Sequence, residues 1–248
     1  MDNFNDILNS INDLNKIYEI FVPSLNSRVK FTGLTAKQQK EVLQTVLDKD
    51  LTGVSFSILI SDIIINNLID KNTNLSSADK NYIITCLRVL SLSSKYRDLD
   101  DQEIDLTPLL TNNISLPKEL TSTTLDEGDL QVNIEIPSLI KDKSVNIETR
   151  KRIIASSGVT TEITKDALGE LYINEIIKFI KTLKTPKTQV NFDDMTFNQK
   201  FQIVEKLPLA ITSKIISFIN SIKDFDKKLF IINNKEYNIA IDPTLFTL

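Results

Sequence analysis

The stretch from Ile17 to Asp50 most strongly constrains the fold, because two extended segments run directly into a capped helix. Residues 17–22 and 28–32 are rich in β-branched and aromatic side chains and lie on either side of a turn-forming break, a pattern typical of a β-hairpin. Thr35 and Gln38 then have the spacing of a capping box, which begins a helix. A hairpin and a short helix cannot bury their apolar faces against each other alone, so later segments must complete the core.

Helical spacing of apolar residues recurs along the rest of the chain. Segment 54–70 has apolar side chains over most of its circumference, which predicts a helix buried on more than one side. Further helices are predicted over 77–93, opened by Ser77, and over 164–183, as well as from 194 to Pro208 and from there to 222. In the 164–183 helix the inward-facing residues are expected to be Leu168, Leu171, Tyr172, Ile176, Phe179, Ile180 and Leu183, with Lys178, Lys181 and Lys184 near its C-terminal end, where cations suit the helix dipole.

Strict alternation of apolar and polar residues over 130–136 predicts a strand, with 144–148 as a weak partner strand. Segments 228–232 and 237–241 flank a polar turn and predict a closing hairpin. The fold class expected from these patterns is α+β, mostly helical, with antiparallel β-hairpins near both ends.

The same patterns divide the chain into four segments. Residues 1–16 are expected to form an N-terminal amphipathic helix, and residues 17–96 a hairpin plus helices. Residues 97–128 form an acidic and polar connector, and 129–248 contain strands, helices and the C-terminal hairpin. The acidic run 98–105 lacks the glycine and the closing glutamate of an EF-hand, so we expect a solvated loop there.

Composition excludes several classes of function. The chain has no histidine, one cysteine and five glycines, so no metal site, cofactor site or glycine-rich phosphate loop is expected. Cys86 is expected to be a small apolar core residue. A net charge of −4, from 29 basic and 33 acidic residues, favours protein partners over nucleic acid or anionic lipid.

Membrane insertion is also not expected. Segment 54–69 is the longest apolar-rich stretch, but serines, asparagines and Asp62 interrupt it, and it is too polar to span a bilayer. The first residues carry Asp2, Asp6 and Asp13 where a signal peptide has positive charge followed by an apolar run. These features predict a soluble protein of a reducing compartment.

Both ends of the chain carry apolar residues that can contact a partner protein. One candidate surface is the apolar face of the first helix, and the other is the apolar tail. Docking of each segment on its own chain is the alternative interpretation. The candidate residues are Phe4, Ile7, Leu8, Ile11, Leu14, Leu245 and Phe246.

In the order of its segments, the chain resembles the baseplate hub proteins of T4-like contractile-tailed phages (myoviruses), of the gene twenty-six and gene fifty-one type. The opening resemblance is carried by Ile17–Ser24, Val29–Phe31 and the Gln- and Lys-rich helix that follows. The closing one is carried by Met195–Phe201, Leu207–Leu209, the hairpin and the Leu245-Phe246 tail. The similar parts cover 17–96 and about 130–248. Many relatives have paired cysteines in their hairpins, as in a zinc ribbon, but 228–241 has none, so no metal is carried over.

The resemblance implies a non-catalytic structural or assembly protein of the baseplate hub that acts through contacts with other hub or tail proteins. It leaves open a permanent virion subunit or an assembly chaperone absent from the mature virion. The expected location is the host cytoplasm during assembly or the virion tail baseplate. The copy number and oligomeric state are left open.

Two further classes of function are alternatives. Phage hubs can carry cell-wall-degrading activity, and a carboxylate-based hydrolase would need an acidic pair such as Glu135 with Glu148 or Asp193 with Asp194. These residues are better explained as strand-edge and helix-start residues, so no enzymatic activity is expected. A cytosolic adaptor unrelated to phage is the other alternative.

Overall fold

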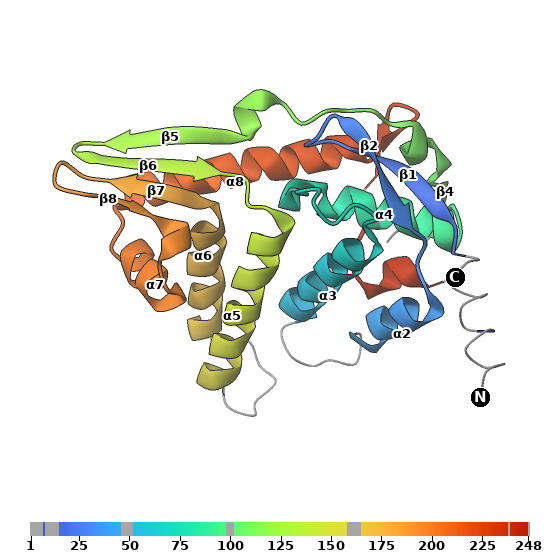
Figure 1. The fold of residues 1–248 in the computed structure, drawn as a ribbon, viewed down its shortest axis with the longest axis horizontal. Coiled ribbons are helices and arrows are strands. Elements are labelled where there is room, and N and C mark those ends of the chain that lie inside the picture. Colours follow the sequence, from blue (N-terminus) through green and yellow to red (C-terminus); the bar gives the residue numbers. More distant parts are fainter. Residues whose placement is uncertain are drawn as a thin grey trace.

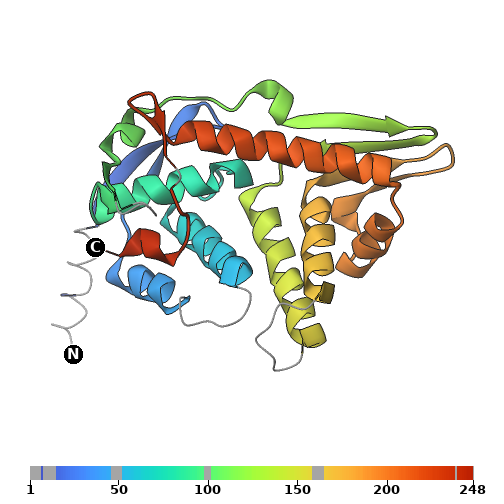
Figure 2. The same ribbon diagram turned by 180° about the vertical axis from the view of Figure 1, so that it is seen from behind.

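The computed structural model describes residues 7, 15–45, 52–97, 102–157, 165–237 and 239–247. These residues form two lobes, each with its own hydrophobic core, and the long helix α8 (Leu209–Leu229) runs across both (Figures 1 and 2). The α+β class is confirmed, with antiparallel pairing throughout the described strands. None of the helices in the described part of the chain has the length and hydropathy needed to cross a bilayer.

The first lobe contains both ends of the described chain (Figure 1). Four 3-10 turns lie along its connections, at Ser77–Asp79, Thr107–Thr111, Lys118–Leu120 and Pro243–Phe246. Its helices and strands are β1 (Ile17–Val22), β2 (Ser27–Thr32), α2 (Ala36–Gln44), α3 (Thr52–Asn67), α4 (Lys80–Ser91), β3 (Lys95–Arg97), β4 (Glu103–Asp105), β9 (Ile231–Ile232) and β10 (Lys235–Glu236).

The predicted hairpin and capped helix are both confirmed. β1 and β2 pair antiparallel from Ile17 opposite Thr32 to Val22 opposite Ser27. At the start of α2, the Gln38 amide donates to the Thr35 hydroxyl and the Thr35 amide donates to the Gln38 side chain at 3.0 Å. These bonds satisfy amide groups that the first helical turn leaves without partners.

The helix predicted over 77–93 begins differently from the expectation. Ser76, and not Ser77, forms the capping box, and it precedes a 3-10 turn that leads into α4. Its partner Asp79 is buried and also accepts hydrogen bonds from the amide and hydroxyl of Ser24 in the β1–β2 turn. The cap therefore ties the hairpin to α4, a tertiary role that local spacing does not reveal.

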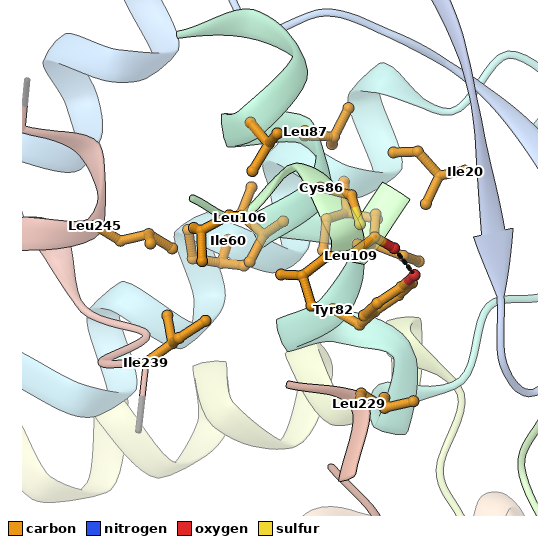
Figure 3. Close-up of a cluster of buried hydrophobic side chains, with 14 of the residues drawn as sticks. Ile20, Ile60, Tyr82, Cys86, Leu87, Leu106, Leu109, Leu229, Ile239 and Leu245 are labelled. Atoms are coloured by element: carbon orange, nitrogen blue, oxygen red, sulfur yellow. Dashed lines mark hydrogen bonds between the residues drawn. The ribbon is translucent and has the colours of Figure 1, made fainter. Parts of the chain in front are cut away.

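The first-lobe core is built mainly from α3 and α4. Their buried side chains include Ile60 and Ile64 of α3 and Leu87 of α4, and Cys86 is a fully buried core residue, as predicted. Figure 3 shows the Tyr82 hydroxyl donating to the carbonyl oxygen of Leu109, at 2.6 Å. This bond gives the buried phenol a partner within an otherwise apolar cluster.

The C-terminal tail completes the same core. Leu245 and Phe246 are fully buried in the cluster that contains α3 and α4, and Figure 3 shows Leu245 and Ile239 beside it. The buried guanidinium of Arg88 donates to the carbonyl of Leu245 at 2.9 Å, and the Gln39 side chain donates to the carbonyl of Phe246 at 3.0 Å. The tail is therefore held by main-chain hydrogen bonds as well as by apolar burial.

The second lobe contains a four-stranded antiparallel sheet in the order β5-β6-β7-β8. Val132 and Ile134, on one face of β6, share a core with residues of α6, α7 and α8. Figure 1 shows α5, α6 and α7 together below the sheet. The elements are β5 (Ser122–Glu127), β6 (Leu130–Glu135), α5 (Leu139–Ser157), α6 (Lys165–Phe179), β7 (Ile180–Lys184), β8 (Gln189–Asn191), a 3-10 turn (Phe192–Asp194) and α7 (Phe197–Glu205).

Two predictions in this lobe are wrong. Segment 144–148 belongs to α5 and is not a partner strand, because β6 pairs with β5 and β7. The helix predicted over 164–183 ends at Phe179, and 180–184 forms β7. A short apolar pattern fits both a helix and a strand, and in each case the available sheet partner decided between them.

The ends of the connector and of the closing hairpin also differ from the predictions. The irregular connector expected up to 128 includes β5, and Glu103–Asp105 of the acidic run pairs with β3, whereas 98–101 lie outside the described residues. α8 continues to Leu229, so the closing hairpin pairs only 231–232 with 235–236. Its turn residues Asn233 and Asn234 have φ of 51° and 62°, the left-handed conformation that a tight hairpin turn requires.

Candidate interaction cleft

A cleft of about 550 Å³ lies where α3 of the first lobe meets α5, α6 and α8. Figure 2 shows α3, α5 and α6 beneath α8. A smaller cavity of about 180 Å³ shares Glu175, Lys178 and Lys223 with the cleft and reaches Asn81 and Asp226. The cleft residues are Gly53, Val54, Ser57, Asn146, Thr149, Leu171, Tyr172, Asn174, Glu175, Lys178, Ile216 and Lys223.

A largely buried group of ionic side chains joins the lobes beside the cleft. Asp142 of α5 lies between Lys80 of α4, at 2.7 Å, and Lys178 of α6, at 3.0 Å. Lys178 also pairs with Glu175 at 2.7 Å. We call these four residues the interlobe ion cluster. A further pair, Lys143 with Asp62, connects α5 to α3 beside it.

Neighbouring charges favour the ionised forms of Asp142 and Lys178. Burial favours the neutral form of Asp142, but Lys178 and Lys80 outweigh it and hold the pKa of that carboxyl below its usual value. Burial likewise opposes the charge of Lys178, yet Glu175 and Asp142 raise the pKa of its ammonium group. Asp142 and Lys178 therefore remain charged at neutral pH, and the cluster links α4, α5 and α6 electrostatically.

Two buried asparagines of the cleft differ in their hydrogen bonding. The carboxamide of Asn146 donates to the Ser57 hydroxyl at 3.1 Å and to Asp142 at 3.3 Å. Asn174 is only 1% exposed, and within the described part of the chain neither its Nδ2 nor its Oδ1 has a hydrogen-bond partner. A buried polar group without a partner destabilises a fold by about 1–3 kcal/mol, so such groups in native proteins call for an explanation.

The outer wall of the cleft is apolar and partly exposed. Leu171 of α6 and Ile216 of α8 line it. Leu168 is 56% exposed and Tyr172 is 45% exposed, so the expectation that these two face inward is wrong. Because the helix packs on α5 and α7 through other residues, this apolar strip on α6 remains open to solvent.

Asp226 of α8, in the adjoining cavity, provides a pH-dependent prediction. Its Oδ2 accepts from the Asn81 side chain at 2.8 Å. Burial raises the pKa of Asp226 to about 6, although Asn81 and Lys80 oppose the shift. Between about pH 4 and pH 6 the folded state therefore keeps this proton, whereas the unfolded chain releases it. The contribution of the protonated Asp226 to the free energy of unfolding is fully present below about pH 4. It is lost as the pH rises to about 6.

We therefore expect the free energy of unfolding of the wild type to fall, relative to Asp226→Asn, on the order of 3 kcal/mol between pH 4 and pH 6 and to stay level above that. Urea unfolding of both proteins at several pH values measures this difference. Parallel pH profiles would show that Asp226 does not titrate as described.

The predicted contact residues at the two ends of the chain lie in different surroundings. Leu245 and Phe246 are buried in their own chain, which is the alternative interpretation given above for the tail. Ile7 is exposed and helical, whereas Phe4, Leu8, Ile11 and Leu14 lie outside the described residues.

The sequence patterns did not identify the cleft, although one signal for it was present. Asn174 follows Leu171 by three positions, so a polar residue interrupts the apolar face of a predicted helix.

Three of the four carboxylates considered for hydrolysis, Glu135, Glu148 and Asp193, form ion pairs with lysines. Glu148 pairs with Lys151 at 2.6 Å. Lys181 bridges Glu135 at 3.1 Å and Asp193 at 3.0 Å from strand β7, so the helix-dipole role predicted for it is wrong. Although burial opposes it, bonding from two lysines holds the pKa of Asp193 below its usual value. In the described residues, no group of three or more His, Cys, Asp or Glu side chains is placed to hold a metal ion.

The fold and the cleft define an α+β protein with two cores, one shared helix and a partly apolar cleft beside an ion cluster that joins the lobes. A family model described as T4 bacteriophage base plate protein matches residues 15–242. The chain therefore belongs to the T4 bacteriophage base plate protein family, which implies a structural or assembly role in the phage tail baseplate and interaction with other tail or baseplate proteins. No curated protein and no solved structure matches the chain.

Proposed function

We propose that this protein is a non-catalytic component of the baseplate hub of a contractile phage tail and acts by binding other hub or tail proteins. The observation that carries the proposal is the family match over 15–242. The pairing of Asp193 with Lys141 and Lys181 supports it, because these lysines lower the pKa of the carboxyl and make it a poor general acid near neutral pH. The exposed apolar strip on α6 supports a role in protein contacts.

A permanent hub subunit is the form of the proposal that we test first. Quantitative mass spectrometry compares the chain with known baseplate proteins in purified phage particles and in infected-cell lysate. Recovery in particles at a fixed ratio to those proteins is the expected result. Abundance in lysate with absence from particles would instead make the protein an assembly chaperone that leaves before the virion is complete.

Two further measurements address the rest of the proposal. A cell-wall hydrolysis assay of the wild type, with Glu135→Gln as the control, is expected to give no activity in either protein. Activity that the substitution abolishes would contradict the non-catalytic role.

Residues 1–14 remain a proposed second contact with a partner protein. Their apolar residues are Phe4, Ile7, Leu8, Ile11 and Leu14. Deletion of this segment is expected to weaken partner binding without unfolding the chain.

A further inference from the structure

We propose that the cleft between α3, α5, α6 and α8 binds an extended peptide segment of another baseplate protein, whose main-chain amide group pairs with the carboxamide of Asn174. The inference rests on the proposed function and specifies how the partner is bound. Three observations carry it: the unpartnered carboxamide, the apolar wall beside it, and the charge at the mouth of the cleft.

The carboxamide of Asn174 is the strongest of these observations. It lines the cleft, is 1% exposed, and has no partner for either polar atom among the described residues. A carboxamide offers a donor and an acceptor side by side, which complement the carbonyl and the amide of an extended peptide. Both atoms are buried in the free protein, so binding requires this side chain to turn toward the cleft, where such a segment would satisfy both atoms at once. Asn146 in the same cleft differs, because its amide group already donates to Ser57 and Asp142.

The walls of the cleft fit a side chain next to that peptide group. Val54, Leu171 and Ile216 line the cleft, whose volume of about 550 Å³ lies within the range of ligand sites. Tyr172 and Leu168 continue the apolar surface along α6 into solvent. A segment that buries one apolar side chain in the cleft would therefore also cover this strip, whereas a compact ligand would leave it exposed.

The charges of the cleft favour a particular kind of segment. Glu175 and Lys178, which line the cleft, are committed to the interlobe ion cluster, so they do not attract a charged ligand. Lys223 at the mouth is exposed and, within the described part of the chain, has no ion-pair partner. An apolar anchor followed by an acidic residue therefore matches the cleft best.

The first test compares Asn174→Leu with the matched control Asn146→Leu in the full-length chain. Asn174→Leu is expected to leave the thermal midpoint of the free protein unchanged or raised, because it removes an unpartnered polar group. It should weaken binding of a partner baseplate protein by about ten-fold or more, since the main-chain pairing is lost. Asn146→Leu is expected to lower the midpoint, because it breaks bonds to Ser57 and Asp142.

The probes are the other baseplate proteins of the same phage, each purified and titrated onto the wild type and both variants. A lowered midpoint for Asn174→Leu would show that the carboxamide is already satisfied within the folded chain, and it would overturn the inference. Unchanged partner binding by Asn174→Leu would overturn it as well, while leaving the proposed function intact. Failure of the wild type to bind any of these proteins would overturn both.

The second test locates the occupant directly. A photoreactive benzophenone residue replaces Tyr172 in the full-length chain, and the same residue at exposed Leu209 is the control. Irradiation of the complex is expected to link position 172, but not position 209, to one short contiguous segment of the partner. Cross-links only between two copies of this chain, or equal cross-linking from both positions, would contradict a peptide-binding cleft.

Discussion

Replacing Ile64 with aspartate is expected to abolish cooperative folding. Ile64 lies on α3, is fully buried, and belongs to the first-lobe core. An unpaired carboxylate in that position either remains charged at a cost of several kcal/mol or takes up a proton that the unfolded chain lacks at neutral pH. Since domains are typically stable by only about 5–15 kcal/mol, the loss is comparable to the whole stability. Thermal unfolding followed by circular dichroism measures it.

The matched control is Ile69→Asp, at a position just beyond the same helix where the side chain is 44% exposed. A charge there stays in water, so a change of about 0.5 kcal/mol or less is expected. If Ile64→Asp remained soluble and melted cooperatively near the wild-type temperature, the assignment of α3 as the central core helix would be wrong.

Replacing Asp142 with asparagine is expected to destabilise the protein by about 3–5 kcal/mol at neutral pH, because it leaves two buried lysines without their shared counter-charge. Lys80 and Lys178 contact this carboxylate from different helices, and all three side chains are largely buried. Since the pKa of Asp142 is lowered in the folded state, its contribution is present above the usual carboxyl pKa and is lost as the pH falls through the folded value. The effect of the substitution should therefore shrink in acid.

Urea unfolding at pH 7 and in acid measures this effect. Asp224→Asn is the control, because Asp224 forms an exposed pair with Lys227 and exposed pairs contribute about 0–1 kcal/mol. Equal losses for the two variants would show that the interlobe ion cluster does not stabilise the junction of the lobes. Loss of partner binding without loss of stability in Asp142→Asn would assign the cluster to recognition instead.

Local sequence signals predicted much of the secondary structure. The first hairpin, the capping box at Thr35, the buried helix now seen as α3 and strand β6 follow from contacts within or between adjacent segments. Such contacts involve residues close in the chain, so side-chain type and spacing are sufficient to indicate them. The predictions failed at 144–148 and 180–184, where helix and strand patterns overlap and where a sheet partner from another part of the chain decided the outcome.

The candidate cleft could not be predicted in the same way. Its walls come from four helices spread over 53–223, and Asn174 becomes notable only because no neighbouring group satisfies it. By itself, the sequence determined the α+β class, the opening hairpin, the capped helix and the absence of histidine chemistry. Only the tertiary structure decided that Leu245 and Phe246 complete the first core, that α8 serves both cores, and that Asp142 lies between two lysines. The physical reason is that local hydrogen bonding and periodicity are properties of a segment, whereas packing and electrostatic pairing depend on which distant segments meet.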